Sequence, residues 1–239
     1  MSMRFLFRFL GLAVLAASAT RADLVIKPSD IKDGRYSYKL EQSDMSTLAP
    51  DSGKLPGWEW KQTGNKFFDD VYSFSNLRMT AGHWSFIQMS PGARTAEFVY
   101  RFDFSRTSRR PTLMRLREVV RHEQDGATYA KRAVTSFASF YRVGEKGDWL
   151  PLHASEPGVG FRGDKVYFTD PIKIDGQPEV VYYKVVFTSD RPITGGYLKK
   201  GDKAGKYGRG GPLWNMTRPD QPDNFFQVVF QTSPAGFSR

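Results

Sequence analysis

The chain has 239 residues, a formal net charge of +10 and no cysteine. The lack of cysteine excludes disulfide bonds, a lipoprotein attachment site and thiolate-based zinc sites. The positive charge favours anionic partners such as acidic polysaccharide, anionic lipid or nucleic acid.

The first residues have the features of a secretory signal peptide. Arg4 and Arg8 precede or interrupt an apolar run over 5–17, and the run ends at small residues, Ala17-Ser18-Ala19. This run is shorter than the roughly 20 apolar residues that span a bilayer. We therefore expect a signal peptide over 1–19, with a cut after Ala22 as the alternative. The mature chain, 20–239, is expected to be secreted or periplasmic, with no transmembrane segment. Loss of the two arginines reduces the charge from +10 to +8, and export makes nucleic acid the least favoured partner.

The clearest strand pattern follows the turn at 90–92. Polar residues or valine separate five apolar residues along this segment, which are Ala96, Phe98, Tyr100, Phe102 and Phe104. Alternation with a period of two is typical of a strand buried on one face. The pattern predicts a strand whose aromatic face lies in the core.

Further short strands are expected along the rest of the chain, at 36–40, 58–60, 72–77, 84–89, 137–143, 166–168, 180–188 and 225–232. The 180–188 segment is apolar at most positions, which predicts burial on both faces. Many short strands separated by turn residues are typical of a sandwich. We therefore predict an all-β protein, a single antiparallel β-sandwich resembling a jelly roll. Its core should include Phe98, Tyr100, Phe102, Tyr182 or Tyr183, and Phe226.

The segment 112–123 fits two patterns. Leu113, Leu116 and Val120 suit a helical stripe, whereas Met114, Leu116 and Val120 suit a strand face that Glu118 interrupts. The turn Asp125-Gly126 favours a β-hairpin, because both positions tolerate positive φ. This register places Leu116 opposite Thr135, and His122 opposite Tyr129.

One face of the predicted hairpin is basic. It collects Arg115, Arg117, Arg121 and Arg132. Guanidinium groups bind carboxylate or sulfate with two parallel hydrogen bonds, which lysine does less well. We therefore nominate this face for ligand binding, with a merely solvated sheet face as the alternative.

A basic, glycine-rich loop over 195–211 is the second candidate for ligand binding. Its cations and rings, together with a tryptophan that follows, are Tyr197, Lys199, Lys200, Lys206, Tyr207, Arg209 and Trp214. Aromatic rings could lie under the apolar face of a sugar while the cations hold its acid groups. The alternative is a charged linker between two strands.

Catalytic motifs are scarce. An enzymatic alternative is a polysaccharide lyase on the same fold, with His122 and Tyr129 as a proton relay. The predicted register places Arg115 and Arg117 on the opposite face from this pair, which weakens the lyase hypothesis. No pair of carboxylates suited to a hydrolase stands out, and no metal site or cofactor is expected.

Three segments carry a resemblance to a known family. They are SFASFYRV, the turn Glu145–Trp149, and the late strand YYKVVF. Together they resemble the jelly-roll sugar-binding modules of the discoidin and sialidase-adjunct kind, over about Ala133 to Thr188. The Gly and Asp of the turn are transposed relative to those modules. The resemblance implies glycan binding and assigns no site residue.

These observations together predict an exported, non-catalytic carbohydrate-binding β-sandwich that prefers acidic polysaccharide. A polysaccharide lyase, or a structural or protein-interaction domain of the cell envelope, remains the alternative.

Overall fold

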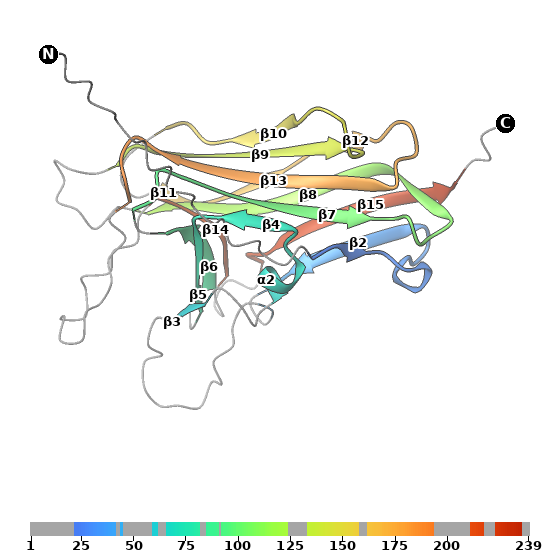
Figure 1. Cartoon of the computed structure of the whole chain (residues 1–239), viewed down its shortest axis with the longest axis horizontal. Helices are drawn as coiled ribbons and strands as arrows, with labels where there is room; N and C mark the ends of the chain where they lie inside the picture. Colours follow the sequence, from blue (N-terminus) through green and yellow to red (C-terminus); the bar gives the residue numbers. More distant parts are fainter. Residues whose placement is uncertain are drawn as a thin grey trace, which may run out of the picture.

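Two β-sheets stacked face to face make up the protein in its computed structural model (Figure 1). The structure describes residues 22–41, 44, 59–61, 66–81, 85–90, 92–123, 133–157, 162–193, 211–217 and 223–235. The strands are β1 Leu24–Val25, β2 Arg35–Leu40, β3 Glu59–Lys61, β4 Ser73–Ser75, β5 Leu77–Ala81, β6 Ser85–Met89, β7 Thr95–Asp103, β8 Arg109–Glu123, β9 Thr135–Val143, β10 Leu150–Ala154, β11 Arg162–Phe168, β12 Ile172–Lys173, β13 Val180–Ser189, β14 Gly211–Thr217 and β15 Phe226–Pro234. The 3-10 helix η1 Pro28–Asp30 and the α-helix α2 Lys66–Asp70 accompany them.

The six-stranded sheet has the order β1-β7-β13-β9-β10, with β4 also paired to β7. The three long strands β7, β13 and β9 are antiparallel and in continuous register. The short β1 pairs with β7 in parallel, so the sheet is not wholly antiparallel. The prediction of an all-β sandwich is confirmed.

The nine-stranded sheet is built around β8. Its order is β2-β15-β8-β14-β6-β5-β3, and β11 and β12 also pair with β8. Strand β15 pairs with residues 109–117 of β8, and β14 pairs with residues 120–123. At fifteen residues, β8 is long enough to hold two neighbours in succession on each side.

Aromatic side chains fill the space between the sheets. The five residues of the alternating pattern in 96–104 are each at most 1% exposed, and Phe226, Tyr182 and Tyr183 are also buried. The predicted core is therefore confirmed. Residues Val180 to Tyr183 are all buried as well, which fits burial of that strand on both faces.

The helix α2 lies between β4 of one sheet and β2 of the other (Figure 1). Phe67 packs on Phe98 and Trp214, with ring centroids 5.2 and 6.0 Å apart. The Tyr38 hydroxyl donates a hydrogen bond of 2.8 Å to Asp70. The sequence patterns did not predict this helix, because its five residues are too few to show a helical period.

The predicted hairpin between 112–123 and 126–137 is wrong in its pairing. Leu116 lies opposite Val228 rather than Thr135, and Thr135 lies opposite Ser189 in the other sheet. The segment 112–123 is a strand, as favoured, but its chain crosses to the other sheet before β9. Tyr129 lies outside the described residues.

None of the helices in the described part of the chain has the length and apolar character needed to cross a membrane.

Candidate functional site

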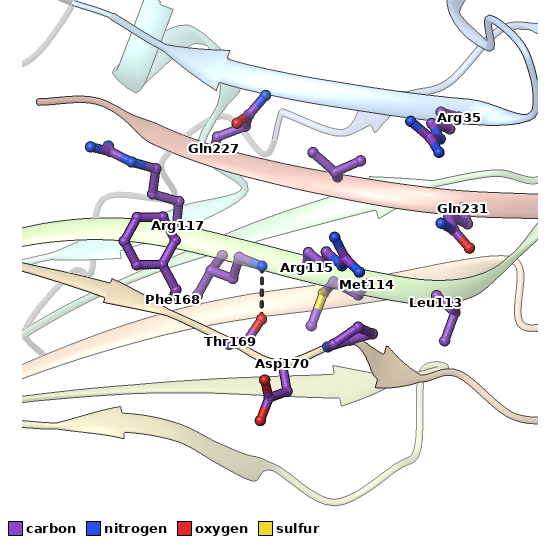
Figure 2. A pocket seen from close by; sticks show the side chains of 13 residues that line it. Arg35, Leu113, Met114, Arg115, Arg117, Phe168, Thr169, Asp170, Gln227 and Gln231 are labelled. Carbon is purple, nitrogen blue, oxygen red and sulfur yellow. Dashed lines mark hydrogen bonds between the residues drawn. The ribbon is translucent and has the colours of Figure 1, made fainter. Parts of the chain in front are cut away.

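A groove of about 570 Å³ lies on the outer face of the nine-stranded sheet (Figure 2). Strands β2, β8 and β15 form its floor, and the connection between β11 and β12 forms one wall. The lining residues are Arg35, Leu113, Met114, Arg115, Leu116, Arg117, Phe168, Thr169, Asp170, Pro171, Gln227, Val229 and Gln231.

Strand register arranges the floor in rows across the sheet. In one row Arg115 lies opposite Val229, and in the next Arg117 lies opposite Gln227. In the third row Gln231 lies between Leu113 and Arg35. These side chains face outward because their neighbours Met114, Leu116, Val228 and Phe230 point into the core. The register thus places three arginines and two glutamines from three strands in one groove.

Thr169 fixes the wall of the groove to β8. Its backbone N–H donates to the Leu116 carbonyl at 3.1 Å, and its Oγ1 accepts the Leu116 N–H at 2.9 Å. Thr169 therefore supplies hydrogen-bond partners for the Leu116 backbone of β8 in the gap between β11 and β12. This contact (dashed in Figure 2) sets the position of Phe168 on one side and Asp170 on the other.

Two arginines of the groove form no ion pair with any residue that the structure describes. Arg115 and Arg35 are both exposed, and neither takes part in an ion pair within the described parts of the chain. Arg115 points into the middle of the groove, between Phe168 and Gln231 (Figure 2). Both guanidinium groups are thus free to bind an anion.

Arg117 has a different role at the other end of the groove. Its guanidinium donates to the backbone carbonyls of Phe225 and Asp223. It also lies over the Phe225 ring, 3.9 Å from the centroid, and 5.6 Å from the centroid of Phe168. Burial lowers the pKa of this guanidinium from its ordinary value. Arg117 therefore holds the aromatic end of the groove together.

The structure describes three of the four arginines of the predicted basic face. Arg115, Arg117 and Arg121 alternate along β8 as expected, and the first two line the groove. Arg121 lies opposite Leu213, beyond the groove. Arg132 lies outside the described residues. A ligand-binding role for these arginines stays a prediction.

Of the ligand-binding candidates in and after the glycine-rich loop, the structure describes only Trp214. Tyr197, Lys199, Lys200, Lys206, Tyr207 and Arg209 lie outside the described residues. Trp214 is on β14 and 0% exposed, packed 4.7 Å from Phe226 and 4.8 Å from Phe98 between ring centroids. The expectation that Trp214 contacts a ligand is therefore wrong, because its ring belongs to the core.

The proposed proton relay of His122 and Tyr129 receives no support. His122 lies opposite Arg162 on one side and Pro212 on the other, and Tyr129 lies outside the described residues.

A second polar cluster lies between the sheets, and sequence reasoning missed it. Glu118 of β8 is 0% exposed and accepts three hydrogen bonds from the six-stranded sheet. The donors are Ser139 Oγ at 2.7 Å, His153 Nδ1 at 2.5 Å and the Tyr183 hydroxyl. Burial, and then the charge of Glu118, raises the pKa of Tyr183 well above its ordinary value. Tyr183 therefore remains a hydrogen-bond donor at neutral pH.

This Glu118 cluster is separate from the groove. None of the four residues lines it, and the His153 side chain is only 13% exposed. The His153 ring packs on Tyr167, with centroids 5.0 Å apart. The arrangement satisfies a buried carboxylate and links the two sheets, which is a structural role.

The sequence contained a signal for several groove residues that we did not use. In 225–232, Gln227, Val229 and Gln231 alternate with core residues, and Arg35 alternates with Tyr36 and Tyr38. Their outward position follows from that pattern. Their closeness to Arg115 does not, because it depends on which strands are neighbours. Phe168 has no such signal.

No group of three potential metal ligands occurs among the residues that the structure describes.

Comparison with known proteins gives little more. No family model matches the chain, and no curated protein matches it. Among solved structures, it is similar to the enzymatically active domain of tailspike protein 4 of bacteriophage CBA120, with a TM-score of 0.31 and 9% identity. That match covers 79% of this chain and 21% of the tailspike chain. It is also similar to the Stig cyclase Fisc from Fischerella sp. TAU, with a TM-score of 0.30 and 11% identity over 87% of this chain and 88% of that chain. TM-scores this low support no inference about function.

Proposed function

We propose that the protein is an exported, non-catalytic carbohydrate-binding β-sandwich that holds an acidic polysaccharide in the groove of its nine-stranded sheet. The observation that carries this proposal is Arg115. It is an exposed cation at the centre of a groove, with no ion-pair partner among the described residues.

The glutamines and the phenylalanine of the groove suit a sugar. Amide side chains such as Gln231 both donate and accept hydrogen bonds, as sugar hydroxyl groups do. The Phe168 side chain is large, apolar and 67% exposed, although burial of aromatic surface is normally favourable. An apolar ring face beside a free guanidinium matches a ligand that has both a ring and an acid group.

The overall charge supports an anionic ligand. The formal charge is +10 for the full chain and +8 after loss of Arg4 and Arg8, and either value attracts polyanions generally. The groove adds local selectivity to this attraction, because Arg115 and Arg35 have no carboxylate bound to them within the described parts of the chain.

The test is binding of alginate and of heparin to the mature protein at physiological salt, measured by isothermal titration calorimetry. Arg115→Gln should weaken binding about 5-fold or more, since a hydrogen bond to a charged group contributes about 1.5–3 kcal/mol. Arg94→Gln is the matched control. Arg94 is an exposed arginine in the turn before β7, in the other sheet, and its loss should have little effect.

Equal binding by Arg115→Gln and the parent would refute the assignment of the groove. Release of an unsaturated, ultraviolet-absorbing product from alginate would instead favour a polysaccharide lyase.

A further inference from the structure

We infer that the groove has two subsites, an acid subsite at Arg115 and Arg35 and a ring subsite at Phe168, so that its ligand is a short acidic oligosaccharide segment of two or three sugars. This inference rests on the proposed function and adds the size and polarity of the ligand.

The acid subsite extends from Arg115, on β8 in the middle of the groove, to Arg35 on β2. Gln231 lies directly between Leu113 and Arg35 in the sheet, one row from Arg115. Both arginines are exposed and without an ion pair in the described chain. A carboxylate here can accept hydrogen bonds from a guanidinium and an amide together.

The ring subsite occupies the opposite end. Phe168 lies beside Arg117 in the register of β11 and β8, and its ring centroid is 5.6 Å from that guanidinium, with the two side chains next to each other in Figure 2. Arg117 donates from its two terminal nitrogens to the carbonyls of Phe225 and Asp223, so two of its five N–H donors bind the backbone. We therefore assign Arg117 as a positioning residue that supports the Phe168 ring, rather than as a second residue that binds the acid groups of the ligand.

The two subsites are too far apart for one sugar to use both fully. Arg115 and Arg117 are two residues apart on β8, or about 7 Å along the strand. The row of Arg35 and Gln231 is a further two residues away. A groove of 570 Å³ falls within the range of clefts that enclose a small molecule, which suits two or three sugars and not a long chain.

The experiment is a chain-length series of galacturonate oligomers, from one to five units, titrated into the mature protein and followed by NMR at physiological salt. Affinity should rise from the monomer to the dimer or trimer and then level off. Arg115→Gln should weaken the monomer and the trimer alike, about 5-fold or more. Phe168→Ala should weaken the trimer about 5-fold and leave the monomer unchanged.

Arg117→Lys tests the positioning role. It should weaken the trimer but not the monomer, and it should have no added effect in a double variant with Phe168→Ala, because both changes remove the same ring contact. Leu150→Ala is the apolar control, since Leu150 is 44% exposed on β10 of the other sheet. Phe168 is exposed, so its truncation leaves the core intact.

Three results would overturn the inference. They are an equal loss of monomer and trimer affinity in Phe168→Ala, affinity that continues to rise through the pentamer, and additive effects of Arg117→Lys and Phe168→Ala. Failure of the parent to bind any oligomer, alginate or heparin would instead refute the proposed function itself.

Discussion

Glu118 is a buried residue of β8 that hydrogen bonds from the opposite sheet hold in place. Its carboxylate is fully buried, and its three donors come from β9, β10 and β13 of the opposite sheet. A buried carboxylate costs free energy unless hydrogen bonds replace the lost water. Here Ser139, His153 and Tyr183 replace it, so one side chain of β8 connects three strands of the other sheet.

Replacing Glu118 with Ala should therefore destabilise the protein strongly. The change leaves three buried donors without their acceptor, and disruption of such a buried ionic or polar network costs about 3–5 kcal/mol. The free energy of unfolding in urea measures the effect. Glu97→Ala, an exposed glutamate on β7, is the control and should stay within about 0.5 kcal/mol of the parent. Similar losses for the two variants would contradict the role assigned to the cluster.

At the scale of elements, the connection between β11 and β12 is held by one residue. Thr169 makes both a backbone and a side-chain hydrogen bond to Leu116. Thr169→Val keeps the shape but removes the Oγ1 acceptor, so the Leu116 N–H loses its partner. We expect a loss of about 1–2 kcal/mol in stability and weaker ligand binding, because the same contact positions Phe168.

Amide hydrogen exchange at Leu116 measures this directly. The Leu116 amide should exchange faster in Thr169→Val, while amides at the centre of β13 should keep their protection. Thr188→Val, a change on the exposed part of β13, is the matched control. Unchanged exchange at Leu116 would show that the side-chain bond contributes nothing to the wall of the groove.

Glu145, in the turn between β9 and β10, should make the stability of the protein depend on pH. Glu145 accepts hydrogen bonds from the Tyr182 hydroxyl and from Arg101, the latter at 2.9 Å. The bond from Tyr182, and then that from Arg101, lowers the pKa of Glu145 below its ordinary value of 4.5. A lowered pKa in the folded state gives stability that is present above pH 4.5 and is lost as the pH falls through the folded pKa.

Glu145→Gln should therefore reduce stability at neutral pH and lose this effect in acid, where the parent carboxylate is itself protonated. Urea midpoints between about pH 2 and pH 7 give the comparison. Glu97→Gln, at an exposed glutamate of the same sheet, is the control for the loss of one negative charge. A Glu145→Gln deficit that persisted unchanged in acid would refute the pKa explanation.

At the scale of the whole molecule, the net charge and the groove act together on the same ligand. The charge attracts any polyanion and is screened by salt, whose Debye length is about 8 Å at physiological ionic strength. The groove should also contribute contacts that salt does not screen, such as the Phe168 ring.

Binding to alginate should therefore weaken as salt is raised from about 0.05 to 0.5 M, and it should not vanish. Phe168→Ala should lower the affinity that remains at high salt, whereas Arg94→Gln should not. Calorimetric titration at several salt concentrations measures both the affinity that salt removes and the affinity that remains. Complete loss of binding at high salt would mean that the interaction is nonspecific attraction to a basic surface.

Local sequence patterns are enough to predict which residues of a strand share a face. Alternation placed Phe98, Tyr100 and Phe102 in the core, and the same rule placed Arg115 and Arg117 outside, because side-chain direction in a strand depends only on parity. It also placed Glu118 on the core face with Leu116, a position that we interpreted as an interruption of the pattern.

Which strands are neighbours, in contrast, depends on the packing of the whole chain. Asp125-Gly126 favoured a local hairpin, but β8 pairs with β15, more than a hundred residues away in the chain. Such pairing depends on the packing of two whole sheets, and no local pattern encodes it. The groove needs β2, β8, β15 and the β11–β12 connection side by side, and the donors to Glu118 come from three strands of the other sheet. Both sites therefore follow from long-range packing, whereas the faces that form them follow from the local sequence.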